Sequence, residues 1–370
     1  MSEETYFYRA GARREVEKAP DIIAISFLRP TALPEDVALT ETRVGSTNLR
    51  GITHPRPRFG VYRLDLYKGV RPSVLCERRD RAMTALRASD RTLFVSHAYR
   101  SDPDSETNVL VLTDEIVAEI PDLPLPRLRK VLARRGLRYL RAIERPRRIV
   151  LLQVTARAGE NALKAANRLV EDGIAAAAEP NFVRRLPHRA MGSSVARARA
   201  RGPDAKAPSD PLFRKQWHLE NRGQTGGTPG ADIGALVAWA RTMGSPEITI
   251  AIVDDGLDLE HEEFRGKGKV LPGYNFQDRN DDPSATPTNR HGTACAGLAA
   301  AAANNKKGGC GVAPGCRLLP VRTPDEWGDE VGYADSLAWA ADHGADVISC
   351  SWGPPDGYWS DDPLPLAMSA

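Results

Sequence analysis

Residues 248–256, ITIAIVDDG, decide the fold class of this 370-residue chain. They begin with a run of β-branched and small side chains, and two aspartates and a glycine follow at once. A run without polar alternation is typical of a strand that is buried on both faces of a parallel sheet. The aspartates then stand at the carboxyl end of that strand, which is the edge where α/β folds build their sites.

The C-terminal half of the chain repeats this alternation of strand and helix. Two further apolar runs and two helical segments follow, at 318–323, 347–353, 292–303 and 331–343, with Gly344 after the last. We expect residue 347 onward to form a strand buried like the first one. The pattern predicts a doubly wound α/β layer over residues 211–370.

Residues 109–185 carry a different order of elements. The patterns predict a strand at 115–120, a helix at 126–136, two strands around Pro146, a helix at 159–173 and a strand at 174–182 that stops at Pro180. The order β-α-β-β-α-β is that of an α+β ferredoxin-like domain.

The remaining segments carry less information. Residues 186–210 hold small, basic and proline residues without an apolar period, which predicts a basic flexible linker. Residues 1–108 contain strand patterns at 5–9, 22–27, 58–67 and 92–99, and they predict a mostly β region of unknown role.

Composition bounds the class of protein. A hydrophobic fraction of 41% and a charged fraction of 27% fit a globular chain. The net charge of +3 is too small to point to a particular partner, and no nucleic-acid partner is expected. The five cysteines form no C-x-x-C pair, so reduced thiols are expected. No signal peptide or membrane-spanning segment is evident, which favours a cytoplasmic protein, or a secreted one whose leader is missing, without a membrane partner.

A second stretch, HGTACAG at 291–297, places an imidazole at the start of a helix. Asp254 ends the first strand and His291 opens the helix after it, so both belong to the same sheet edge. A buried carboxylate that accepts the Nδ1–H of a histidine leaves Nε2 as a base. We therefore expect Asp254 and His291 to pair, Asp255 to be a turn or surface residue, and Cys295 to be packing rather than a catalytic thiol.

Four segments together resemble the subtilisin-like serine peptidases (peptidase S8). They are 248–256, 291–297, GVAP at 311–314 and SCSWG at 349–353, and they occur in the family's order. DDGLDLEH and SWGP are closest in style to the kexin and furin branch. Residues 216–233 resemble the start of the catalytic domain in bacterial members, and residues 174–185 resemble the end of the family's inhibitory propeptide.

The resemblance implies a serine endopeptidase, with an incomplete subtilisin-like sheet preceded by a propeptide-type domain. It implies that Asp254 orients His291 as general base, and that Ser351, Trp352 and Gly353 pair with an extended peptide substrate. Glu263 and Asn305 fall where many members bind calcium, although glutamate replaces the usual aspartate. The metal site is therefore unassigned, calcium is the candidate ion, and no other cofactor is expected.

One feature of the family is missing from the sequence. Its nucleophile lies in a Gly-Thr-Ser motif, and no such motif occurs in these 370 residues. In subtilisin, removal of the serine alone lowers kcat about 10⁶-fold. We expect a precursor truncated before its serine and inactive by itself. The alternatives are a non-catalytic binding or inhibitor protein whose partner is a complete peptidase, and a truncated gene product.

Overall fold

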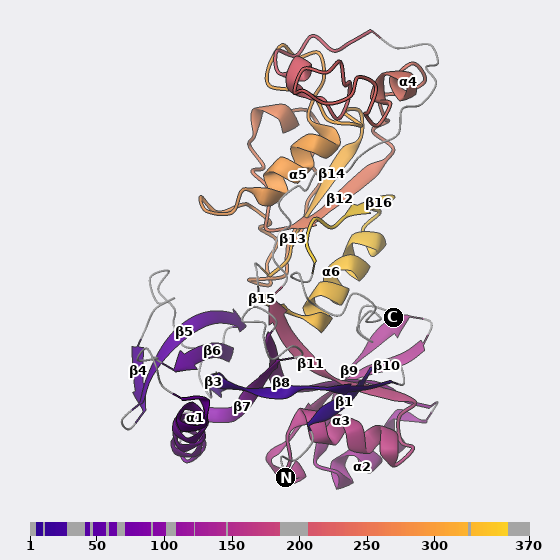
Figure 1. The fold of residues 1–370 in the computed structure, drawn as a ribbon. Helices are drawn as coiled ribbons and strands as arrows, with labels where there is room; N and C mark the ends of the chain where they lie inside the picture. Colours follow the sequence, from indigo (N-terminus) through magenta and orange to yellow (C-terminus); the bar gives the residue numbers. More distant parts are fainter. Residues whose placement is uncertain are drawn as a thin grey trace. The chain divides into compact units, whose positions relative to one another are not determined.

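The structure, a computed structural model, consists of two compact units (Figure 1). One unit comprises residues 1–187, 326–334 and 354–370, and the other comprises residues 188–325 and 335–353. The residues that the structure describes are 5–9, 12–27, 41–44, 47–56, 59–64, 71–89, 92–100, 109–121, 123–145, 147–185, 206–324 and 327–353. The predicted linker lies outside them except for its last residues, 206–210.

The first unit is built on one large sheet. Its strands follow the order β15-β11-β8-β7-β3-β6-β5-β4, and β10 pairs with β8 and carries β9. The bounds are β3 Glu17–Phe27, β4 Glu41–Val44, β5 Thr47–Arg56, β6 Phe59–Leu64, β7 Thr92–Arg100, β8 Val109–Glu119, β9 Leu137–Arg145, β10 Arg147–Val154, β11 Ala177–Arg185 and β15 Trp327–Asp329. A separate hairpin joins β1 (Tyr6–Arg9) to β2 (Ala12–Glu15).

Within this unit, the predicted β-α-β-β-α-β order is present. The elements are β8, α2 (Leu125–Arg134), β9, β10, α3 (Ala162–Glu171) and β11, and the strands lie in the order β11-β8-β10-β9. Apolar residues of both helices, Leu128 and Leu132 of α2 and Leu163 and Leu169 of α3, pack into one buried cluster against the sheet. Because β8 also pairs with β7, this domain shares its sheet with the strands of residues 1–108.

Several boundaries in this segment differ from the expectation; β8, for example, begins at Val109 rather than at residue 115. The helix α3 begins at Ala162 because Gly159 has φ +66° and Asn161 accepts a hydrogen bond from the Lys164 amide at 3.0 Å, as an N-cap does. The strand β11 begins at Ala177 and continues through Pro180. Its register shifts between Pro180 and Phe182, and an irregularity of this kind accommodates a residue without an N–H.

Sequence analysis missed four of the described elements of residues 1–108. They are β2, β4, β5 and α1 (Pro72–Arg87), whereas the predicted strands at β1, β3, β6 and β7 are present. The pattern of α1 is interrupted because a buried arginine lies among its apolar residues. Arg79 is 3% exposed, and its guanidinium donates to the Ala19 carbonyl at 2.7 Å.

The second unit contains a parallel sheet in the order β13-β14-β12-β16. Its strands are β12 Thr249–Asp254, β13 Tyr274–Asn275, β14 Arg317–Arg322 and β16 Val347–Ser349. Its helices are α4 (Ala235–Trp239), α5 (His291–Ala300) and α6 (Glu330–Asp342). The first turn of α6 belongs to the other unit.

The strand β12 is buried along its whole length, as its sequence predicted. Ile250 and Ile252 pack in one cluster with residues of α5, and Ala251 and Val253 pack in another with Ala340 of α6. Helices therefore cover both faces, which confirms the doubly wound α/β class. The strand predicted at 347–353 is present as β16, but the prediction of its length and burial was wrong, because β16 has three residues at the edge of the described sheet and Val347 is 53% exposed.

We predict that Gly136→Ala destabilises the first unit more than Gly173→Ala does. Gly136 has φ +71°, and an added Cβ would lie 2.3 Å from the Ala158 amide nitrogen. Gly173 has φ +66°, and nothing lies within 4 Å of an added Cβ. The Gly173 variant should therefore lose only about 1 kcal/mol of unfolding free energy, from backbone strain. Urea unfolding of the whole chain should show a loss of about 3 kcal/mol for Gly136→Ala. Equal losses for the two variants would contradict the packing argument.

Candidate active site

Asp254 lies at the carboxyl end of β12, between the ends of β14 and β16. It is 1% exposed, and its Oδ1 accepts the Asp255 amide at 2.9 Å. Because β12 pairs with a neighbour on each side, this carboxylate is held at a fixed position on the sheet edge.

His291 is the first residue of α5, and its ring meets Asp254. The distance from His291 Nδ1 to Asp254 Oδ1 is 2.8 Å, as the sequence predicted from the shared edge. With Nδ1–H donating to the carboxylate, Nε2 is the basic nitrogen of the neutral ring. The imidazole is 28% exposed and its partner is buried, so the ring can exchange a proton with a bound molecule while its orientation stays fixed.

The second aspartate has a role that sequence analysis missed. Asp255 is 5% exposed rather than a surface residue. Its Oδ1 accepts the Gly292 amide at 2.7 Å, and its Oδ2 accepts the His291 amide at 3.2 Å. Both amides belong to the start of α5, where unsatisfied N–H groups and the helix dipole favour a negative charge. Asp255 therefore fixes the helix that carries the imidazole, and the Asp-Asp pair was the available signal.

Cys295 stands one helical turn after His291 and contacts the same ring. Its Sγ lies 3.7 Å from Nδ1 and 3.9 Å from Nε2. Burial raises the pKa of the Cys295 thiol to about 11, so the sulfur is protonated at neutral pH and is a poor nucleophile. The prediction of a packing thiol fits this environment. All five cysteines are described, and all are unbridged.

Asp254, His291 and Cys295 also form a group that the sequence did not suggest. One ligand atom from each lies within 4.8 Å of the others, which is the spacing of a metal site. The histidine and cysteine spacings in the sequence gave no sign of it, because the aspartate comes from another segment. A metal ion there would occupy the very groups that orient the imidazole.

The three residues expected to contact a peptide lie after β16. The Trp352 indole donates to the Val253 carbonyl at 2.8 Å and packs with the cluster beneath β12. The nearby Ser351 side chain lowers the pKa of the Cys295 thiol, against the larger effect of burial. Gly353 is buried. These contacts place Ser351 and Trp352 beside the Asp254–His291 pair.

Glu263 and Asn305 also come together, away from this pair. The Asn305 amide donates to Glu263 Oε2 at 2.8 Å, and Glu263 is 6% exposed. Among the described residues, Glu263 Oε1 has no hydrogen-bond partner. Asp210, which sequence analysis missed, holds the loop by accepting the amides of Asn304 and Asn305. A buried carboxylate oxygen without a partner, next to an amide side chain, fits the oxygen ligands of calcium.

Comparisons with known proteins support the resemblance. The sequence profile of the subtilase family (Peptidase_S8) matches residues 245–368. The calcium-dependent protease of Nostoc sp. is 36% identical over 237 residues, which are 64% of this chain and 32% of that protein. Neuroendocrine convertase 2 of Bos taurus is 38% identical over 170 residues, which are 44% of this chain and 26% of that protein. The chain thus spans about a third or less of the length of these curated relatives.

A solved structure is also similar. Fervidolysin from Fervidobacterium pennivorans, a keratinolytic enzyme related to subtilisin, matches with a TM-score of 0.46 and 21% sequence identity, over 70% of this chain and 37% of that one. Among the described residues, no helix has the length and apolar character needed to cross a bilayer.

We predict that Gly292→Ala separates His291 from Asp254, whereas Gly297→Ala in the same helix does not. A Cβ at Gly292 would lie 2.3 Å from the Gly256 carbonyl oxygen and 3.0 Å from Asp254 Cβ, but nothing lies within 4 Å at Gly297. Overpacking at Gly292 should cost about 3 kcal/mol, and alanine at Gly297 should stabilise α5 by about 0.5 kcal/mol.

The readout is the proton NMR resonance of the hydrogen-bonded His291 Nδ1–H, together with thermal unfolding. The resonance should be lost in the Gly292 variant and kept in the Gly297 variant. Retention of the signal in both would contradict the close approach of α5 to β12.

Proposed function

We propose that this chain is a member of the subtilase family of serine peptidases and carries the Asp-His part of a serine endopeptidase site. The observation that carries the proposal is the 2.8 Å contact between Asp254 and His291 at the carboxyl edge of a parallel sheet. Asp254 would hold the ring in the tautomer whose Nε2 accepts a proton from a serine hydroxyl. The serine would attack a peptide carbonyl, and His291 would then protonate the leaving amine.

The nucleophile is a separate part of the proposal. The 370 residues contain no Gly-Thr-Ser motif, so we assign the catalytic serine to sequence outside them. Without it, binding and the remaining polar groups supply little of the rate enhancement of a complete triad. This chain by itself would then bind a polypeptide without hydrolysing it.

A second candidate function, inhibition of a complete peptidase by residues 109–185, is favoured by one contact inside the first unit. The strand β15, from within the residues that match the subtilase profile, pairs with the end of β11. Glu330, which follows β15, lies 3.1 Å from the Arg9 guanidinium and also contacts Arg184. A propeptide-type domain that binds a peptidase segment in this way could act as an inhibitor or a folding aid.

Calcium is the metal that we assign to Glu263 and Asn305. The Nostoc relative is named a calcium-dependent protease, and the buried Glu263 carboxylate has the chemistry that a hard cation requires. A bound ion would neutralise this carboxylate and tie the loop of Asn305 to the segment of Glu263. The buried Glu263 carboxylate thus fits a calcium ion.

A fluorophosphonate serine probe tests the first proposal. The 370-residue chain should not be labelled. A polypeptide extended by the downstream reading frame, if that frame encodes a Gly-Thr-Ser motif, should be labelled, and Asp254→Asn should slow labelling about 10⁴-fold. Gly297→Ala serves as the control that keeps the rate.

Two outcomes would contradict parts of this assignment. Labelling of the 370-residue chain that disappears in His291→Ala would place the nucleophile inside these residues. A downstream frame without the motif would favour the inhibitor or binding protein.

Calcium should raise the melting temperature of the chain by several degrees, because an ion at 100 times its Kd adds about 2.7 kcal/mol to the stability of the folded state. Glu263→Gln should abolish the increase. Glu262→Gln is the matched control, since the Glu262 carboxylate is 50% exposed and pairs with Lys307 at 2.7 Å. Differential scanning fluorimetry with calcium and with chelator measures the effect. An equal increase in both variants would place the ion elsewhere.

A further inference from the structure

The large sheet of the first unit forks along β8. One edge of β8 pairs with β11 over nearly its whole length. Its other edge pairs with β7 at residues 109–111 and then with β10 at residues 115–119. β7 and β10 therefore diverge from β8 near Asp114, and the Ser96 hydroxyl closes the fork by donating to the Leu112 carbonyl at 2.7 Å.

The fork leaves part of β7 as an edge strand. In the part of the chain that the structure describes, residues 92–97 of β7 pair with β3 alone. Leu93 on this edge is 58% exposed, and the Arg87 guanidinium donates to the Val95 carbonyl at 3.1 Å. An edge strand offers backbone N–H and C=O groups to any added strand, and proteins normally cover or charge such edges.

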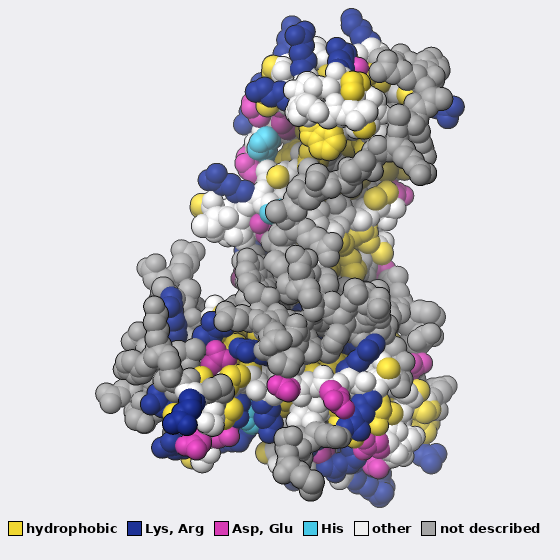
Figure 2. All heavy atoms as spheres, viewed as in Figure 1, with side chains coloured by type: hydrophobic (Ala, Val, Ile, Leu, Met, Phe, Trp, Pro, Cys, Tyr) yellow, Lys and Arg dark blue, Asp and Glu magenta, His cyan; other side chains and the backbone are white. Residues whose placement is uncertain are grey.

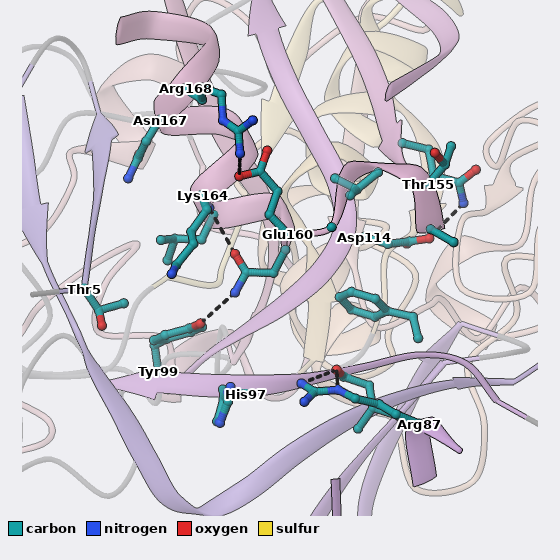
Figure 3. Close-up of a pocket in the computed structure, with 18 of the residues that line it drawn as sticks. Thr5, Arg87, His97, Tyr99, Asp114, Thr155, Glu160, Lys164, Asn167 and Arg168 are labelled. Atoms are coloured by element: carbon teal, nitrogen blue, oxygen red, sulfur yellow. Dashed lines mark hydrogen bonds and ion pairs between the residues drawn. The ribbon is translucent and has the colours of Figure 1, made fainter. Parts of the chain in front are cut away.

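A groove with a volume of about 1200 Å³ runs between this edge and α3 (Figure 3). The helix contributes Asn161, Lys164, Asn167 and Glu171, whose spacing of three or four residues puts them on one helix face. Asn167 is 6% exposed. Its Nδ2 donates to the Tyr6 carbonyl at 2.7 Å, but its Oδ1 has no hydrogen-bond partner among the described residues. A buried acceptor without a partner costs free energy, and an N–H donor of a bound molecule would satisfy it.

The lining of the groove carries a small excess of positive charge. Five cationic residues and three carboxylates line it, and the cations are Lys18, Arg87, Arg138, Lys164 and Arg168. The carboxylates are engaged locally: Glu171 accepts the Tyr6 hydroxyl at 2.8 Å, Asp114 accepts the Gln153 amide at 2.8 Å, and Glu160 pairs with Arg168. On the face seen in Figure 2, lysine and arginine side chains of this unit are interspersed with acidic ones.

His97 does not add to this charge at neutral pH. Burial lowers the pKa of His97 to about 4, and the nearby Arg79 charge acts in the same direction. The ring also contacts the Asp80 carboxylate at 3.3 Å, and the Lys18 charge lowers the pKa of His97 further. The electrostatic attraction of the groove therefore rests on its lysines and arginines.

We infer that this groove binds an extended acidic peptide of a partner protein, which adds a strand to the free edge of β7 and lies against α3. A strand edge facing a helix is the geometry of β-strand addition, in which main-chain hydrogen bonds give affinity and flanking side chains give specificity. The volume exceeds the range of about 300–1,000 Å³ typical of small-molecule pockets. The same sheet already accepts a strand with an acidic end, since β15 ends at Asp329 and pairs with the end of β11, and Glu330, which follows β15, contacts Arg184.

The test uses the 370-residue chain and two fluorescent hexapeptides, acetyl-Glu-Val-Glu-Val-Glu-Val-amide and its lysine counterpart. Fluorescence anisotropy should show the acidic peptide binding at least tenfold more tightly than the basic one. Hydrogen exchange should become slower in the amides of residues 93–97 when the acidic peptide is bound. Lys18→Glu combined with Lys164→Glu should weaken binding at least tenfold, and Arg127→Glu, on the exposed face of α2, should leave it unchanged.

Two further probes separate this mode from simple charge attraction. An acidic peptide that is N-methylated at every second residue keeps its charge but cannot form one row of main-chain hydrogen bonds, so one of the two N-methyl registers should fail to bind. Free glutamate at the same carboxylate concentration should not compete. Equal binding of both N-methylated peptides, competition by glutamate, or no protection of β7 would each overturn the proposal.

Discussion

The structure of the candidate site depends on two adjacent carboxylates at the end of β12. Asp254 holds the imidazole of His291, and Asp255 holds the backbone that carries it. Burying such charges costs free energy unless donors compensate for the lost water. Here the start of α5 supplies the donors, and its dipole favours the negative charge. The strand end and the helix start therefore need one another, and neither could move without exposing an unsatisfied group.

Small side chains let these two elements approach each other. Gly292 lies so close to β12 that no Cβ would fit, and Ala296 and Ala300 are fully buried in the same contact. Cys295 fills the remaining space beside the ring with an atom that burial keeps protonated. The small residues of α5 thus allow tight packing on the sheet, and the position of the helix sets the distance between Asp254 and His291.

Sequence analysis located the parts of the fold in which one local pattern decides the structure. ITIAIVDDG predicted β12 and the pairing of Asp254 with His291, because burial and edge position follow from the run itself. It failed where a distant partner decides. The helix α1 was missed because the buried Arg79 interrupts its apolar pattern, and the acceptor that allows this burial, the Ala19 carbonyl, lies in another segment. β11 passes through Pro180 because its register shifts there. Asp255 was predicted to be a turn or surface residue, and its burial was missed because its helix partners lie 36 and 37 residues away.

Buried ion pairs around Glu330 lie beside the end of β11, at the edge of the large sheet. Arg9 and Glu330 have side chains that are 0% and 2% exposed, and Glu179 binds the same arginine at 3.1 Å. Buried pairs of this kind add little net stability compared with apolar packing, but removal of one partner leaves a costly unpaired charge. The cations beside the edge of β7 differ in this respect, because Lys18 and Lys164 are exposed. Their attraction for an acidic strand is therefore weakened by solvent and salt, and main-chain hydrogen bonds to β7 have to supply the rest of the affinity.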